Sequence, residues 1–127
     1  MAGMIRLDTH LIVWLYAGDI ERLSATAIDA IETHDLLVSP MVQLELTYLH
    51  EIGRLTVGGS EIIGDLRDRI GLRLSDEPMA SVVHAATSLT WTRDPFDRMI
   101  VADAIVAATD LLTKDQTILA NTSLARW

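Results

Sequence analysis

Short apolar runs separated by longer helical patterns organise this chain. Four runs read as strands, at residues 4–7, 36–39, 72–74 and 111–113. The first, "MIRL", is a short apolar run followed by a turn-forming Asp-Thr, which suits a buried parallel strand better than an alternating surface strand. We therefore expect the first strand to span Met4–Leu7.

Between these runs, apolar residues recur at spacings of three and four, which indicates helices. The expected helices cover residues 9–17, 24–31 after a Ser24 cap, 40–53, 60–70, 78–89 and 94–108. The tail to Trp127 is ambiguous, and a short helix followed by an edge strand fits it. Alternation of strands and helices predicts an α/β fold, a central parallel sheet covered on both faces, as one domain over residues 1–127.

Two acids follow predicted strands and are expected to lie at the same edge of the sheet. Asp8 comes directly after the first strand, and Asp115 lies two residues past "LLT". Ligands of such sheets bind beyond the carboxyl ends of the strands, where the strand order reverses.

The composition narrows the chemistry available there. The 127 residues include no cysteine, so any metal would be held by oxygen and imidazole ligands, which favours Mg²⁺ or Mn²⁺. A net charge of −8 argues against general affinity for nucleic acid but is compatible with an enzyme whose acids surround a metal. There is no Walker loop or Gly-rich dinucleotide turn. Without a signal-like start or a long apolar run, we expect a cytoplasmic protein with no membrane association.

Four acids, Asp8, Glu45, Asp97 and Asp115, interrupt otherwise apolar segments. An acid in such surroundings is costly unless a cation or a proton compensates it. A single divalent metal site would account for all four. Asp103 lies on the same helical pattern as Asp97, and its contribution to this site is left open.

Each acid also has an ordinary explanation. Asp8 and Asp115 could simply cap helices, and Asp94, before Pro95, is assigned mainly to capping. Glu45 falls inside an apolar stripe and could instead mark its edge or form a buried ion pair. That stripe comprises Met41, Leu44, Tyr48, Leu49 and Ile52. The four histidines show no ligand spacing, and the three tryptophans are interpreted as packing or interface residues.

The order of four motifs gives the chain a specific resemblance. "LDTH", "SPMVQLELTYLHEIGRL", "RDPFDRMIVADA" and "LLTKD" together resemble PIN-domain ribonucleases, specifically VapC-type toxins of bacterial toxin–antitoxin pairs. The match spans nearly the whole chain. It departs from the family pattern at Asp103, where many relatives carry an amide, and in "ATDLL", which lacks the usual Gly and Pro.

The resemblance implies a compact PIN-like α/β/α sandwich and a metal-dependent endoribonuclease that cleaves structured RNA with metal-activated water. It assigns Mg²⁺ or Mn²⁺ to Asp8, Glu45, Asp97 and Asp115, as catalytic and metal-binding residues. Supporting roles fall to Thr9, Thr113 and Asp94. It also implies a VapB-type antitoxin partner, an RNA substrate and a homodimer.

Two other functions fit parts of the pattern. A PIN-like module that binds without cleaving would share the fold. A phosphoacceptor receiver domain has similar length and an acidic pocket on a parallel sheet, but its acceptor aspartate should follow a central strand near mid-chain, where this sequence has "GRLTVGGS".

Overall fold

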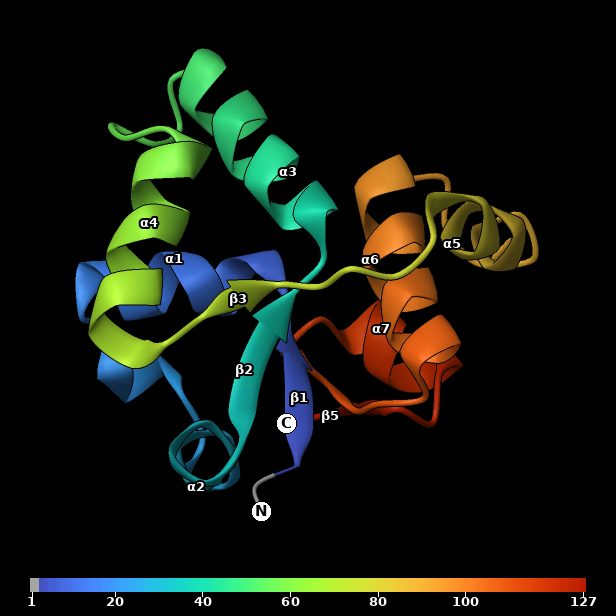
Figure 1. The fold of residues 1–127 in the computed structure, drawn as a ribbon, viewed down its shortest axis with the longest axis horizontal. Coiled ribbons are helices and arrows are strands. Elements are labelled where there is room, and N and C mark those ends of the chain that lie inside the picture. The colour runs from blue at the N-terminus through green and yellow to red at the C-terminus, as the bar shows by residue number, and fades with distance from the viewer. Residues whose placement is uncertain (1–2) are drawn as a thin grey trace.

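The computed structural model describes residues 3–127, and Figure 1 shows its helices and strands. In chain order these are β1 (Met4–Leu7), α1 (Thr9–Ala17), a 3₁₀ turn (Ile20–Arg22), α2 (Ala25–Thr33), β2 (Asp35–Val38), α3 (Pro40–Glu51), α4 (Gly59–Ile70), β3 (Arg73–Leu74), α5 (Met79–Ala86), α6 (Pro95–Ala107), β4 (Leu111–Leu112), α7 (Gln116–Asn121) and β5 (Ala125–Arg126). Within these residues no helix combines the length and apolar character needed to cross a membrane.

The strands form one parallel sheet in the order β3-β2-β1-β4-β5, which confirms the predicted α/β class. Figure 1 places α5 and α6 on one side of this sheet and α1, α2 and α4 on the other. From β1 the chain adds β2 and then β3 on one side, and it then crosses back to add β4 and β5 on the other side of β1, so the strand order reverses at β1. This reversal places the end of β1 where ligands of open α/β sheets bind, and the order differs from that of receiver domains.

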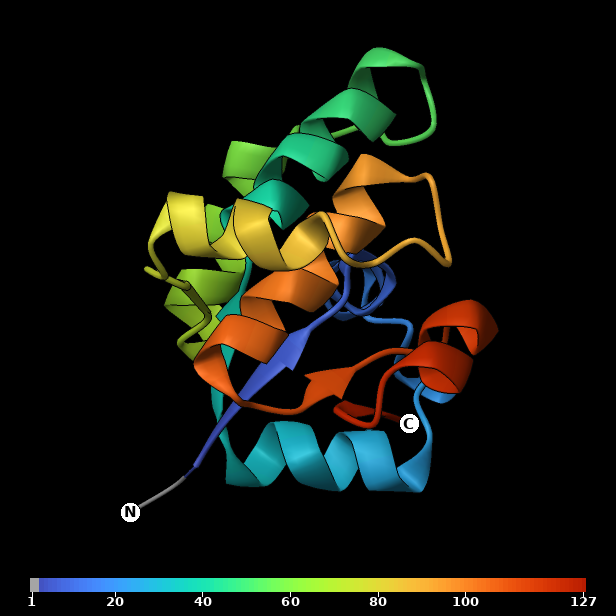
Figure 2. The ribbon, with the colours of Figure 1, turned by 90° about the vertical axis from the view of Figure 1, so that its right-hand side faces the viewer.

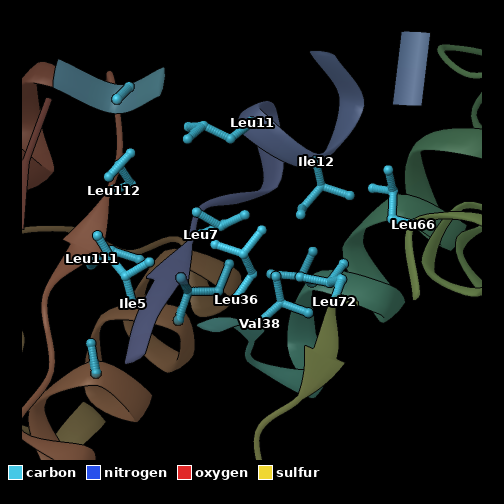
Figure 3. Close-up of a cluster of buried hydrophobic side chains, with 14 of the residues drawn as sticks. Ile5, Leu7, Leu11, Ile12, Leu36, Val38, Leu66, Leu72, Leu111 and Leu112 are labelled. Carbon is cyan, nitrogen blue, oxygen red and sulfur yellow. The ribbon is translucent and has the colours of Figure 1, made fainter. Parts of the chain in front are cut away.

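The strands are short, and β1, β2 and β4 are largely buried, whereas the two residues of β3 are exposed and those of β5 are partly buried. Ile5, Leu7, Leu111 and Leu112 are fully inaccessible to solvent. In Figure 3 the side chains of β1, β2 and β4 lie among residues from α1 and α4, such as Ile12 and Leu66. Because the central strands are buried on both faces, polar groups that follow them emerge only at the ends of the sheet.

Most helix starts follow local capping rules. The Ser24 hydroxyl accepts the amide of Ala27, and Ser39 accepts the amide of Met41 ahead of Pro40. The predicted helix over 78–89 is shorter in the structure, because Pro78 has non-helical backbone angles and acts as the N-cap of α5. The chain beyond Ala86 continues in turns.

The prediction of a single apolar stripe on α3 was wrong in part. The buried residues of this helix are Val42 and Leu46, whereas Leu44, Tyr48 and Ile52 are about half exposed, at 54, 47 and 49 %. The predicted stripe therefore combined residues from two faces. The second face is an exposed apolar strip, defined here as Leu44, Tyr48 and Ile52.

Helix α3 is held closely against α4. A Cβ atom added to Gly59 would overlap the carbonyl of Gln43, so only glycine permits this approach. Figure 2 shows α3 beside α4, and Figure 1 shows β2 pointing toward the start of α3. The contact fixes the helix that carries Glu45.

Helix α6 ends in an unusual way. Ala108, its C-cap, adopts a left-handed conformation with φ 54°, which glycine normally occupies. This is the "ATDLL" turn in which the usual Gly and Pro are absent. The helix end is well formed, but the alanine side chain adds steric strain.

We predict that Ala108→Gly raises the free energy of unfolding by about 0.5–1 kcal/mol, because the relieved strain exceeds the extra chain entropy of glycine. Chemical denaturation measures the difference. The matched control, Ala107→Gly, changes the last helical residue and should cost up to about 1 kcal/mol. A destabilised Ala108→Gly variant would contradict the strain assigned to this turn.

Candidate active site

Asp8 and Asp115 lie at the carboxyl ends of adjacent strands, β1 and β4, as predicted. A buried threonine connects them. The Thr113 hydroxyl donates to Asp8 Oδ2 at 2.7 Å and accepts the backbone amide of Asp115 at 3.0 Å. Its position is set by β4, which is fully buried up to this residue.

Glu45 reaches the same region from α3. The Thr9 hydroxyl donates to Glu45 Oε1 at 2.5 Å, and the Thr9 amide donates to Asp8 Oδ1 at 2.8 Å. A single residue at the start of α1 therefore orients two of the predicted acids. Thr9 is itself 3 % exposed, so its hydroxyl has little freedom to turn elsewhere.

Asp94 and Asp97 come from the first turn of α6. Asp94 Oδ1 accepts the amides of Phe96 and Asp97, the predicted capping role, and Pro95 opens the helix. The Asp97 carboxylate differs from the others, since within residues 3–127 no group donates a hydrogen bond to it. It is partly buried and has no neutral donor to compensate its charge.

Electrostatics shows that these acids form one cluster. Burial raises the pKa of Asp97 from its usual 3.8 to about 7, with further contributions, in decreasing order, from Asp94, Asp8, Glu45 and Asp115. Burial likewise raises the pKa of Asp8 against the hydrogen bonds from Thr113 and Thr9. The pKa of Glu45 is raised by burial and by Asp8 and Asp94, while the Thr9 hydroxyl opposes the shift.

Capping occupies only one carboxylate oxygen of each capping acid in this cluster. Asp94 and Asp115 each cap their helix through Oδ1, which leaves Oδ2 of both free of hydrogen bonds from the described residues. Asp8 caps α1 through Oδ1. The capping explanation is therefore correct for all three residues, and it does not compete with a role in binding.

The donor atoms fit a hard divalent cation, because they are carboxylate oxygens supported by hydroxyls. They do not form a closed coordination shell: within residues 3–127 no three Asp, Glu or His side chains are close enough together to hold a metal ion. Repulsion among ionised carboxylates keeps these side chains apart, and a bound cation would offset that repulsion.

Asp103, which was left open, belongs to a separate network. It is 2 % exposed, accepts Arg6 Nε at 2.6 Å, and accepts the Ser75 hydroxyl at 2.8 Å. Arg6 also donates to Thr109 at 2.8 Å and contacts Glu77 at 3.5 Å. This buried pair joins β1 to α6, the two elements that end or begin beside Asp8 and Asp97.

The sequence contained a signal for that network. Arg6 interrupts the apolar run of the first strand, and a buried guanidinium requires a carboxylate or other acceptors. The partner of Arg6 could not be chosen from sequence, since Asp103 is separated from it by 97 positions.

The profile of the PIN domain family matches residues 5–123. The chain belongs to the PIN-domain family. The matched segment contains all the acids described above, so the cluster lies within the PIN domain.

Individual relatives agree with this membership. The PIN domain is 30 % identical over 115 residues to "Ribonuclease VapC22" of Mycobacterium tuberculosis (strain ATCC 25618 / H37Rv), which covers 88 % of this chain and 87 % of the relative. The present chain is therefore a VapC-type PIN domain. The fold is also similar to VapBC2 from Rickettsia felis bound to a promoter DNA fragment, with TM-score 0.64, 16 % identity and 97 % coverage of both chains. For VapBC-1 from nontypeable Haemophilus influenzae the TM-score is 0.57 at 15 % identity, covering 97 % of this chain and 96 % of that one.

We predict that the metal-free protein loses stability as pH rises from about 4 to 7. A carboxyl whose pKa is raised in the folded state binds its proton more tightly than in the unfolded chain, so the stabilisation disappears as pH rises through the folded pKa. Because Asp97 is partly exposed, we expect a loss of about 1–2 kcal/mol, less than the full shift implies.

Asp97→Asn should flatten this dependence and make the metal-free protein more stable than wild type at pH 7.5. Denaturation with chelator at several pH values measures both effects. Asp68→Asn, which removes an exposed charge on α4, should keep the wild-type slope. An Asp97→Asn variant that is less stable at pH 7.5 would count against a shared acid cluster.

We predict that Asp103→Ala costs about 3–5 kcal/mol of unfolding free energy, because it leaves a buried guanidinium without its carboxylate. The double variant Arg6→Met, Asp103→Leu removes both charges and should cost clearly less. A double variant as unstable as the single one would refute the ion-pair explanation. Urea denaturation of the three proteins gives the comparison.

Proposed function

We propose that this VapC-type PIN domain is a metal-dependent endoribonuclease, the toxin of a VapBC-type toxin–antitoxin pair that cleaves structured RNA. The observation that carries the proposal is the acid cluster at the carboxyl ends of β1 and β4, where Asp97 is half-buried with a pKa of about 7. The relative "Ribonuclease VapC22" supports the activity.

In this proposal Asp8, Asp97 and Asp115 hold Mg²⁺ or Mn²⁺, and Glu45 either binds the ion or orients water. A divalent cation bound there would lower the pKa of a bound water and stabilise charge on the scissile phosphate. Neighbouring threonines orient the carboxylates. Thr113 orients Asp8, and Thr9 orients both Asp8 and Glu45, so their oxygens are placed before substrate arrives.

Asp97 has a second role in this proposal. Its carboxylate has no hydrogen-bond donor within residues 3–127 and a pKa of about 7, so it can hold a proton until a cation displaces it. Asp94 keeps it in position by capping the turn from which it projects. Metal binding is then coupled to proton release from the cluster.

We predict that purified protein cleaves structured RNA with Mg²⁺ or Mn²⁺ and not with chelator, and that Asp97→Asn lowers the rate by at least about 100-fold by removing a charged ligand. Gel analysis of transfer and ribosomal RNAs is the measurement. Asp68→Asn is the matched control and should cleave as wild type does.

A second readout does not depend on activity. Mg²⁺ or Mn²⁺ should raise the melting temperature of wild type and Asp68→Asn, and should have little effect on Asp97→Asn. Metal stabilisation without cleavage of any RNA would favour the alternative, a PIN-like module that binds without cleaving. Equal stabilisation of wild type and Asp97→Asn would remove Asp97 from the metal site.

The proposed partners are a VapB-type antitoxin and a second copy of the chain. The structural neighbours are VapBC proteins, which supports the antitoxin. The exposed apolar strip of Leu44, Tyr48 and Ile52 supports the homodimer, because a continuous row of half-exposed apolar side chains favours contact with another protein surface. Glu45 lies on the same helix, so a dimer formed there would adjoin the acid cluster.

A further inference from the structure

A hollow of about 210 Å³ lies beside the acid cluster and has no role in the preceding proposal. It is lined by His10, Trp14, Lys114 and Asp115. His10 follows Asp8 by two positions, and Lys114 directly precedes Asp115, so the hollow adjoins two of the proposed metal-binding residues. Its lining combines an aromatic ring system with the Lys114 cation and one carboxylate, that of Asp115.

The Trp14 ring is held firmly at one side. Trp127 meets it edge-on with ring centroids 6.1 Å apart, and both rings pack against the core. His10 lies 6.0 Å away, with its ring tilted by 37°. Because Trp14 is fixed by packing, a planar group that stacks on it would not have to order the indole first.

Two cationic side chains lie over the Trp14 ring. Lys114 Nζ lies 5.8 Å and the Arg22 guanidinium carbon 5.9 Å from the ring centroid, within the range of cation–π contacts. Both side chains are long and exposed at the surface, so they can move aside for another ligand. Lys114 is the only lysine of a chain with net charge −8. At this position its ammonium group provides the local positive charge that favours binding of a polyanion.

These features match one chemical class of ligand. Unpaired RNA bases are recognised by stacking on aromatic rings, while Lys and Arg contact the adjoining phosphates. The hollow is smaller than the roughly 300–1,000 Å³ of pockets that enclose a drug-sized ligand, which suits one planar ring with its sugar and phosphate outside.

We propose that His10, Trp14 and Lys114 form a subsite that stacks an unpaired base next to the scissile phosphate. The subsite would make the enzyme prefer loops and bulges over base-paired stems. It rests on the proposed ribonuclease function and adds the residues that would contact the unpaired base. It adds a role for Trp14 to the packing that the sequence predicted and that the structure confirms.

The test uses Asp97→Asn protein with Mg²⁺ and an RNA hairpin that carries 2-aminopurine in its loop. We expect binding to quench the fluorescence of this base, whereas the same base placed in the stem should change little. Trp14→Leu should abolish the quenching and weaken loop binding roughly tenfold, as expected for the loss of one stacked base. Trp14→Tyr, which keeps a ring, should retain most of both.

Trp91→Leu is the matched control, because Trp91 is also partly buried against the core but does not line the hollow. It should bind and quench like the parent protein. Circular dichroism establishes that each variant is folded. If Trp14→Leu does not fold, Trp14→Tyr and Lys114→Met still decide: the former should quench, and the latter should weaken binding. The subsite would be overturned if a folded Trp14→Leu variant quenched as the parent protein does, or if a folded Lys114→Met variant kept the parent affinity. Equal quenching of the loop and stem probes would overturn it as well.

Cleavage separates this inference from the proposed function. In an otherwise wild-type protein, Trp14→Leu should raise KM for loop substrates roughly tenfold with little change in kcat. Metal-dependent cleavage with the wild-type KM would overturn the subsite and leave the ribonuclease intact. Absence of cleavage in wild type, together with quenching that depends on Trp14, would refute the ribonuclease and support base binding.

Discussion

Mutual repulsion of carboxylates at one end of a parallel sheet is the constraint around which this structure is organised. The pKa of Asp97 reaches about 7 because burial and four neighbouring acids disfavour its charge. The fold opposes the repulsion mainly with hydrogen bonds from the Thr9 amide and the hydroxyls of Thr9 and Thr113, and a smaller charge interaction with His10 also lowers the pKa of Asp8 and Glu45. Neutral donors orient the oxygens without cancelling their charge, so the cluster retains its attraction for a cation.

The buried arginine of the described residues, Arg6, does not form a hydrogen bond with any acid of this cluster. Arg6 lies on the strand that ends at Asp8, yet it bonds to Asp103 and Thr109. The ion pair ties β1 to α6 and so sets where the first turn of α6, with Asp97, lies relative to Asp8. Arg6 thus supports the geometry of the cluster without belonging to it, because the ion pair with Asp103 neutralises its charge.

Sequence predicted the features that depend on local pattern. Apolar runs located the four main strands, and capping residues located the starts of α2, α3 and α6. The shared edge for Asp8 and Asp115 followed from strand topology, and the structure brings both together through Thr113. The α3 stripe failed because Leu44 and Tyr48 have helical spacing but face outward, and spacing alone cannot say which of two apolar faces is buried. The hollow at Trp14 was missed because its residues meet only after α1 is packed against the segment between β4 and α7.

The position of Lys114 has a consequence for chemical modification of this protein. Apart from the N-terminus, it is the only primary amine in the chain. Acylation of amines would therefore act at a single side chain, located between Trp14 and Asp115. In most proteins such a reagent spreads over many surface lysines and its local effect is diluted. Here one modification would remove the ammonium charge from the edge of the acid cluster and leave every other side-chain charge of the molecule unchanged.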